Sequence, residues 1–128
     1  MQISFRTLDM FDREFRKLAK KYPSLEKDFQ DFCAFLMEQP IGLGIWDIER
    51  INNLGEDILL PIYKVRKFRC QSLSKNSIQS GIRIIYVYDA SSDTIEFIEF
   101  VEIYHKWSKE IENRGRIIEI YSSRKSLL

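Results

Sequence analysis

The residues best suited to chemistry form one basic stretch in the middle of the chain. Between Asp57 and Asp89 there is no acidic residue, whereas six basic ones occur there: Lys64, Arg66, Lys67, Arg69, Lys75 and Arg83. The whole chain has a formal net charge of only +1. Because local potential depends on how charge is distributed rather than on its sum, the stretch predicts a binding site for a polyanion. The alternative interpretation is a solvated cationic surface.

Other kinds of reactive site have little support in the sequence. The chain has one histidine, His105, and two remote cysteines, Cys33 and Cys70, which do not have metal-ligand spacing. The pair Gly42 and Gly44 lacks the third glycine and the preceding strand of a nucleotide-binding loop. We therefore expect no metal and no cofactor. With neither an apolar leader nor an apolar run of membrane length, we expect a cytoplasmic protein with free thiols and no membrane contact.

The basic stretch must be positioned by strands. Tyr63–Arg69 and Gly81–Tyr88 read as two strands joined by a Ser-rich connection, and alternation in the first predicts that Lys64, Arg66 and Phe68 share one face. A third strand is expected over Thr94–Tyr104. Three glutamates interrupt its apolar residues, and we expect them to be solvated or to face a partner: Glu96, Glu99 and Glu102.

Two amphipathic helices are expected before these strands, after a short opening strand at 3–6. The first helix has apolar residues at helical spacing from Leu8 to Tyr22, with Thr7 or Asp9 as its N-cap, and stops before Pro23. The second starts at a Ser24 cap and runs towards Pro40. The short turn between them predicts an antiparallel helical hairpin.

The C-terminal part is expected to add a short helix and a tail. The charged segment 106–114 predicts a helix that stops at Gly115, and the apolar run 117–121 is either a strand or a partner-binding tail. Residues 1–128 then form a single α+β domain, in which the helical hairpin packs on one face of a small antiparallel sheet. The other face is expected to be open and to carry the cations.

Four phrases in this order resemble one known family. They are F11xxxF15xxLxKKY22, Y63KVR66, S80GIRIIY86 and I103YHK106. The chain is similar in these residues to the RelE/ParE superfamily of type II toxin–antitoxin toxins. The resemblance covers about residues 5–110 and leaves 111–128 as a C-terminal extension.

For the RelE-like branch, the resemblance implies a small, metal-independent endoribonuclease that cleaves mRNA on the ribosome and is held inactive by a cognate antitoxin. By position, it assigns the catalytic cations to Lys64, Arg66, Arg83, His105 and Lys106. Further RNA contacts are expected from residues of the same segments: Lys67, Arg69, Lys75 and Trp107.

Attack of a 2′-hydroxyl on the adjacent phosphate needs proton transfer and stabilisation of extra negative charge. Clustered cations supply the electrostatic stabilisation, and we expect Arg66 and Arg83 to bind phosphate. Lys64 would act as a base or stabilise charge, because neighbouring cations lower a lysine pKa. His105 would be the general acid or base. Two alternatives remain open, a ParE-like inhibitor of DNA gyrase and a binding module without catalysis.

Overall fold

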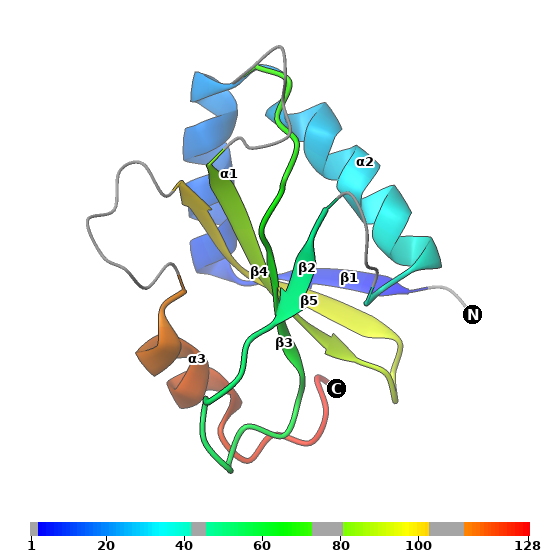
Figure 1. Cartoon of the computed structure of the whole chain (residues 1–128), viewed down its shortest axis with the longest axis vertical. Coiled ribbons are helices and arrows are strands. Elements are labelled where there is room, and N and C mark those ends of the chain that lie inside the picture. The colour runs from blue at the N-terminus through cyan, green and yellow to red at the C-terminus, as the bar shows by residue number, and fades with distance from the viewer. Residues whose placement is uncertain (1–2, 42–45, 73–80, 103–111) are drawn as a thin grey trace.

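The computed structural model describes residues 3–41, 46–72, 81–102 and 112–128, with the side chain of Glu102 left out. The fold is α+β, with five strands and three helices in the described part of the chain (Figure 1). In chain order they are β1 (Ser4–Thr7), α1 (Asp9–Lys21), α2 (Leu25–Glu38), β2 (Ile48–Arg50), β3 (Ile62–Val65), β4 (Ile82–Asp89), β5 (Thr94–Glu102) and α3 (Arg114–Tyr121).

The strands form one sheet in the order β1-β5-β4-β3-β2. The three pairs β2–β3, β3–β4 and β4–β5 are antiparallel, as alternation and short connections favour. β1 instead lies parallel to β5, with Ser4 opposite Thr94 and Thr7 opposite Phe97. The sheet is therefore mixed, and the expectation of a wholly antiparallel sheet is wrong. β4 begins after Gly81, whose φ of +79° favours glycine.

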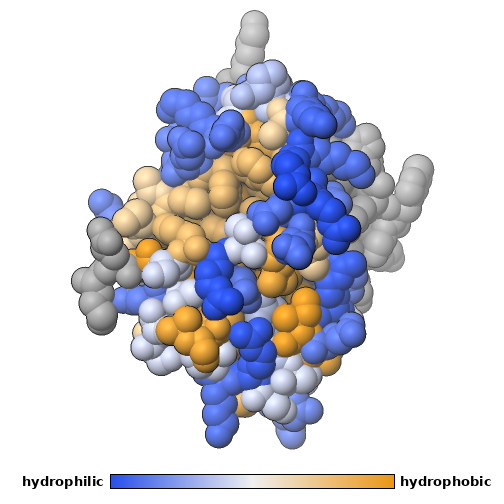
Figure 2. Space-filling model, turned by 180° about the vertical axis from the view of Figure 1, so that it is seen from behind, coloured by the Kyte–Doolittle hydropathy of each residue, from blue (hydrophilic) through white to orange (hydrophobic). Residues whose placement is uncertain are grey.

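An aromatic core joins α1 and α2 to one face of the sheet. Phe29 of α2 lies with its ring centroid 5.5 Å from that of Phe11 and 5.3 Å from that of Phe15, both on α1. Phe11 also stacks on Phe97 of β5 at 5.3 Å. Seen from the opposite side, the surface has an apolar area in its upper half, bordered by hydrophilic side chains (Figure 2). The two predicted helices are present at the expected positions in the chain.

The helix caps differ from those expected. The N-cap of α1 is Leu8 and makes no side-chain cap hydrogen bond, so neither Thr7 nor Asp9 has this role. Ser24 is the N-cap residue of α2, but its hydroxyl does not cap the helix. It donates instead to Asp28 Oδ2 at 2.7 Å, because that buried carboxylate is the stronger acceptor.

A second apolar core covers the sheet face that we expected to be open. Ile85, Val87 and Ile98 of the sheet pack there against Ile117 and Tyr121 of α3, with Leu127 closing the cluster. Residues 117–121 are helical, so the expected strand or tail is wrong. Most of the helix expected at 106–114 lies outside the described residues; residues 112–113 are not helical, and Gly115 lies inside α3 rather than after a helix. Burial of two large side chains from α3 outweighs the local strand preference of its isoleucines.

No helix among the described residues combines the length and the apolar character needed to cross a bilayer.

Candidate functional site

Lys64 lies in β3 on the face covered by α3. Its backbone pairs with Ile85 on one side and with Glu49 on the other. Its Nζ donates to Glu112 Oε2 at 3.4 Å, and the two side chains are only 18% and 5% exposed. The predicted catalytic amine therefore has one carboxylate in contact and a second, Glu49, as its cross-strand neighbour.

Glu112 is ionised in this arrangement. Burial alone would raise its pKa, but a backbone hydrogen bond and the charges of Lys64 and Arg114 together lower the pKa below its usual value. Arg114 holds the other oxygen, with Nη2 at 3.1 Å from Glu112 Oε1. A hollow of about 180 Å³ opens beside these three side chains and is also lined by Glu49 and the segment 50–53. Its cations and carboxylates nearly balance, so its attraction for a phosphate is weak.

Arg66 lies just beyond β3, where strand alternation no longer applies. Its backbone amide donates to the carbonyl of Asp47 at 3.0 Å. Its guanidinium forms ion pairs with Asp47 at 3.8 Å and Glu49 at 3.6 Å, and half of the side chain is exposed. Phe68 is fully buried against α2 in the aromatic core, so the prediction that it shares a face with Lys64 is wrong.

Arg83 lies in β4 opposite Val101 of β5. Lys64 of β3 is opposite Ile85, which lies two residues after Arg83 in β4. Lys64 and Arg83 are therefore diagonal neighbours on one face of the sheet. Residues at such positions are roughly 7 Å apart, so two long side chains there can contact the same phosphodiester. Arg83 Nη1 donates to the carbonyl of Ile82 at 3.1 Å and the residue is half-buried. The structure thus brings together two of the predicted catalytic residues.

Of the remaining predicted site residues, two are among the described residues and four are not. Lys67 and Arg69 are half-buried, and Nε of Arg69 is buried without a hydrogen-bond partner in the described part of the chain. Four predicted residues lie outside the described residues: Lys75, His105, Lys106 and Trp107.

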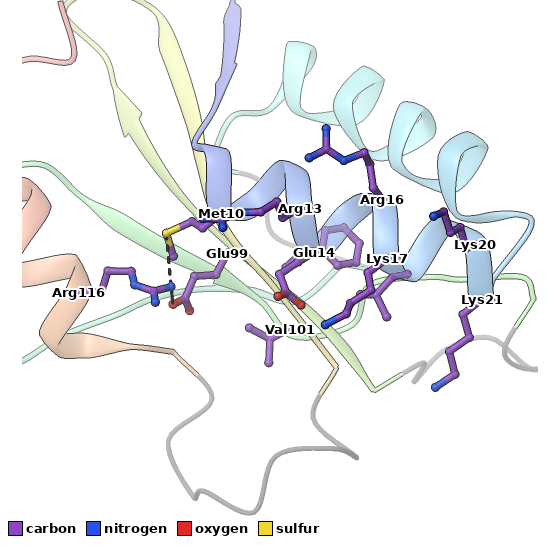
Figure 3. Close-up of a pocket in the computed structure, with 12 residues that line it drawn as sticks. Met10, Arg13, Glu14, Arg16, Lys17, Lys20, Lys21, Glu99, Val101 and Arg116 are labelled. Carbon is purple, nitrogen blue, oxygen red and sulfur yellow. Dashed lines mark hydrogen bonds and ion pairs between the residues drawn. The ribbon is translucent and has the colours of Figure 1, made fainter.

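A groove of about 960 Å³ lies between α1, the end of β5 and the start of α3 (Figure 3). Its floor includes Phe100 and Val101 of β5. Six cations and two acids line it. From α1 come Arg13, Arg16, Lys17, Lys20, Lys21 and Glu14, whereas Arg116 comes from α3 and Glu99 from β5. We name this cavity the α1–β5 groove. Its cationic charge exceeds that of the hollow beside Lys64.

The glutamates of β5 are not solvated as expected. Glu99 is 5% exposed, accepts from the amide of Asn113 at 3.1 Å, and lies 3.9 Å from Arg116. Glu96 is 3% exposed and accepts the hydroxyl of Tyr121 at 2.6 Å. The two carboxylates anchor α3 to the sheet, whereas the side chain of Glu102 lies outside the described residues.

The sequence contained a pattern that would have revealed the groove. Arg13, Lys17 and Lys20 recur at helical spacing on the polar face of α1. Basic residues near the C-terminal end of a helix are ordinarily explained by the helix dipole alone. What could not be read locally is that the end of β5 and Arg116 lie beside this face.

Comparison with known proteins supports the fold. No protein-family model matches the sequence, and no curated protein matches it significantly. A search of solved structures finds the crystal structure of the archaeal RelE–RelB complex from Pyrococcus horikoshii OT3. The match has a TM-score of 0.57 and 14% sequence identity, and covers 83% of this chain and 100% of that one. The RelE-like resemblance of the sequence motifs is confirmed as a shared fold.

Proposed function

We propose that this chain is the toxin of a type II toxin–antitoxin pair and acts in the cytoplasm as a ribosome-dependent, metal-independent mRNA endoribonuclease. The observation that carries the proposal is the placement of Lys64 and Arg83 as diagonal neighbours on one face of a RelE-like sheet. Two cations so placed can bind one phosphodiester and stabilise the charge that develops when a 2′-hydroxyl attacks it.

Arg83 is the principal phosphate ligand in this proposal. Arginine presents a planar fork of donors that matches phosphate oxygens. Its Nη1 donates to the neutral carbonyl of Ile82, whereas Lys64 and Arg66 each form ion pairs with carboxylates.

Lys64 supplies a second positive charge once phosphate competes with Glu112. Their contact of 3.4 Å is long for a charge-assisted hydrogen bond. Proton transfer is assigned to His105 with help from Lys106. His105 and Lys106 lie between the described residues Glu102 and Glu112 in the sequence. Glu102 is paired with Ile82, next to Arg83, and Glu112 contacts Lys64.

The proposed partners are a cognate antitoxin, the ribosome and mRNA. The structural neighbour is a RelE–RelB complex. An antitoxin for this chain follows by analogy of fold, and a ribosome-bound substrate follows from the RelE-like branch that the sequence resembles.

A binding module without catalysis is the second candidate, and one observation favours it. Glu112 holds Lys64 under α3, and α3 itself is fixed by Ile117 and Tyr121, both fully buried. A sheet face covered in this way leaves less room for a substrate than an open one.

Induced expression in a bacterium, with mapping of mRNA 5′ ends, tests the proposal. The wild-type chain should produce new ends within translated frames, and Arg83→Ala should abolish them. Lys125→Ala, on the exposed C-terminal segment, is the control and should cleave as the wild type does. Circular dichroism of purified Arg83→Ala must show an intact fold. Growth arrest with intact mRNA would indicate a gyrase target, and neither arrest nor cleavage would favour the binding module.

A further inference from the structure

We infer that the α1–β5 groove binds the sugar–phosphate backbone of a single-stranded RNA. The inference rests on the proposed function and extends it, because this surface is separate from the basic stretch between Asp57 and Asp89. Among the described residues that line it, Glu14 and Glu99 are the acids, against six cations. The charge of the groove is therefore complementary to a polyanion.

Four of the cations on α1 are available to a ligand. Arg13, Arg16, Lys17 and Lys20 are exposed, and in the described part of the chain none of these four forms an ion pair. By contrast, Lys64 and Arg66 are each held by carboxylates. A ligand at these four side chains displaces no ion pair among the described residues, so its binding is not opposed by that loss.

The shape of the groove suits an extended chain. Arg13, Lys17 and Lys20 are spaced by four and three residues, so they lie along one side of α1 over about two turns, roughly 10 Å. In Figure 3, Glu14 and Lys17 extend from α1 towards the side on which Glu99 and Val101 lie. Arg116 closes the end of the groove near α3, where it is 3.9 Å from Glu99.

The groove is continuous with the proposed catalytic pair. Val101 in its floor is directly opposite Arg83 in β4, and neighbouring strands are about 4.8 Å apart. A backbone that follows α1 and crosses the end of β5 therefore reaches Arg83. This continuity favours an RNA substrate over an acidic protein segment, which would have no reason to continue towards the catalytic cations.

Binding should be measured by fluorescence anisotropy with a labelled, mixed-sequence 2′-O-methyl oligoribonucleotide, which has no free 2′-hydroxyl to attack. The test variant is Lys17→Gln with Lys20→Gln. Losing two phosphate contacts should lower the slope of log affinity against log salt by about 1.4 and weaken binding about 25-fold at 0.1 M salt. Glu14→Gln should strengthen binding, because it removes a negative charge from the groove.

The matched control is Lys27→Gln with Lys125→Gln, which removes the same charge from exposed positions outside the groove. It should retain wild-type affinity and most of the salt slope. Equal weakening by both double variants would overturn the inference, since only net charge would then matter. Failure of the wild type to bind the oligonucleotide would also overturn it. Tighter binding of poly-L-glutamate, weakened by the groove variant, would overturn it as well and would identify an acidic protein as the ligand.

The outcome separates this inference from the proposed function. Groove-dependent RNA binding without cleavage in cells would support the groove and refute the nuclease. Cleavage that is lost in Arg83→Ala, with oligonucleotide affinity unaffected by the groove variant, would support the nuclease and refute the groove.

Discussion

Replacing Glu112 by glutamine tests whether charge holds the start of α3 over the sheet. Glu112→Gln keeps the size of the side chain and one acceptor oxygen but removes the negative charge shared by Lys64 and Arg114. Hydrogen bonds to charged groups contribute about 1.5–3 kcal/mol, and breaking a fully buried ion pair costs about 3–5 kcal/mol. Because the Lys64 and Arg114 side chains are 18% and 32% exposed, solvent screens the pair. We expect a loss of about 2 kcal/mol at neutral pH.

The pH dependence of that loss identifies its cause. The folded-state pKa of Glu112 is lowered, so its ionised form stabilises the folded chain above the unfolded pKa of about 4.3. This stabilisation disappears as pH falls through the lower folded-state pKa. The free energies of unfolding of wild type and Glu112→Gln should therefore differ by a constant amount above about pH 6 and converge below about pH 4.

Urea unfolding followed by circular dichroism at a series of pH values makes the comparison. Glu119→Gln is the control, because Glu119 is exposed on α3, the helix that follows Glu112, and it should change stability by less than about 0.5 kcal/mol. Equal stability of Glu112→Gln and wild type at neutral pH would refute the reasoning. A difference that persists at low pH would show that packing, rather than charge, fixes this part of the chain.

Two further predictions concern buried polar groups. Tyr121→Phe should destabilise the chain by about 2 kcal/mol in urea unfolding, because buried Glu96 loses the hydroxyl donor at 2.6 Å. Tyr88→Phe should cost less, because its hydrogen-bond partner Asp93 is half-exposed. Equal losses of stability in the two variants would contradict this account. Burial raises the pKa of Cys33 to about 12 and Cys70 is fully buried, so native protein at pH 8 should take up iodoacetamide far more slowly than protein in urea, as followed by mass spectrometry. Rapid labelling of the native chain would show that the aromatic core opens readily.

The parts of the fold that could be predicted are those set by short-range pattern. The apolar spacing from Leu8 to Tyr22, closed by Pro23, is sufficient for α1. Alternation within a strand does not say that Lys64 and Arg83 share a face, because that follows from the register of β3 with β4. The prediction fails for Phe68 because β3 ends at Val65, and strand alternation has no meaning beyond a strand end.

The parts that could not be predicted depend on contacts between distant residues. Nothing near Ser4 indicates that its strand runs parallel to Thr94. Isoleucines in 117–121 favour a strand locally, and only the sheet face they cover makes them helical. Glu112 would be expected at the surface, since an acid is buried only with partners that the sequence does not reveal, here Lys64 and Arg114.

The parallel pairing of β1 with β5 also constrains the order in which the chain folds. During synthesis from the N-terminus, β1, α1 and α2 are made long before the strand that joins them to the sheet. Phe11 and Phe29 must wait for Phe97 and Phe100, which arrive late in translation. Until then the aromatic side chains of the two helices are open to water and to other nascent chains. High contact order of this kind slows folding, so the finished sheet forms only after most of the protein exists.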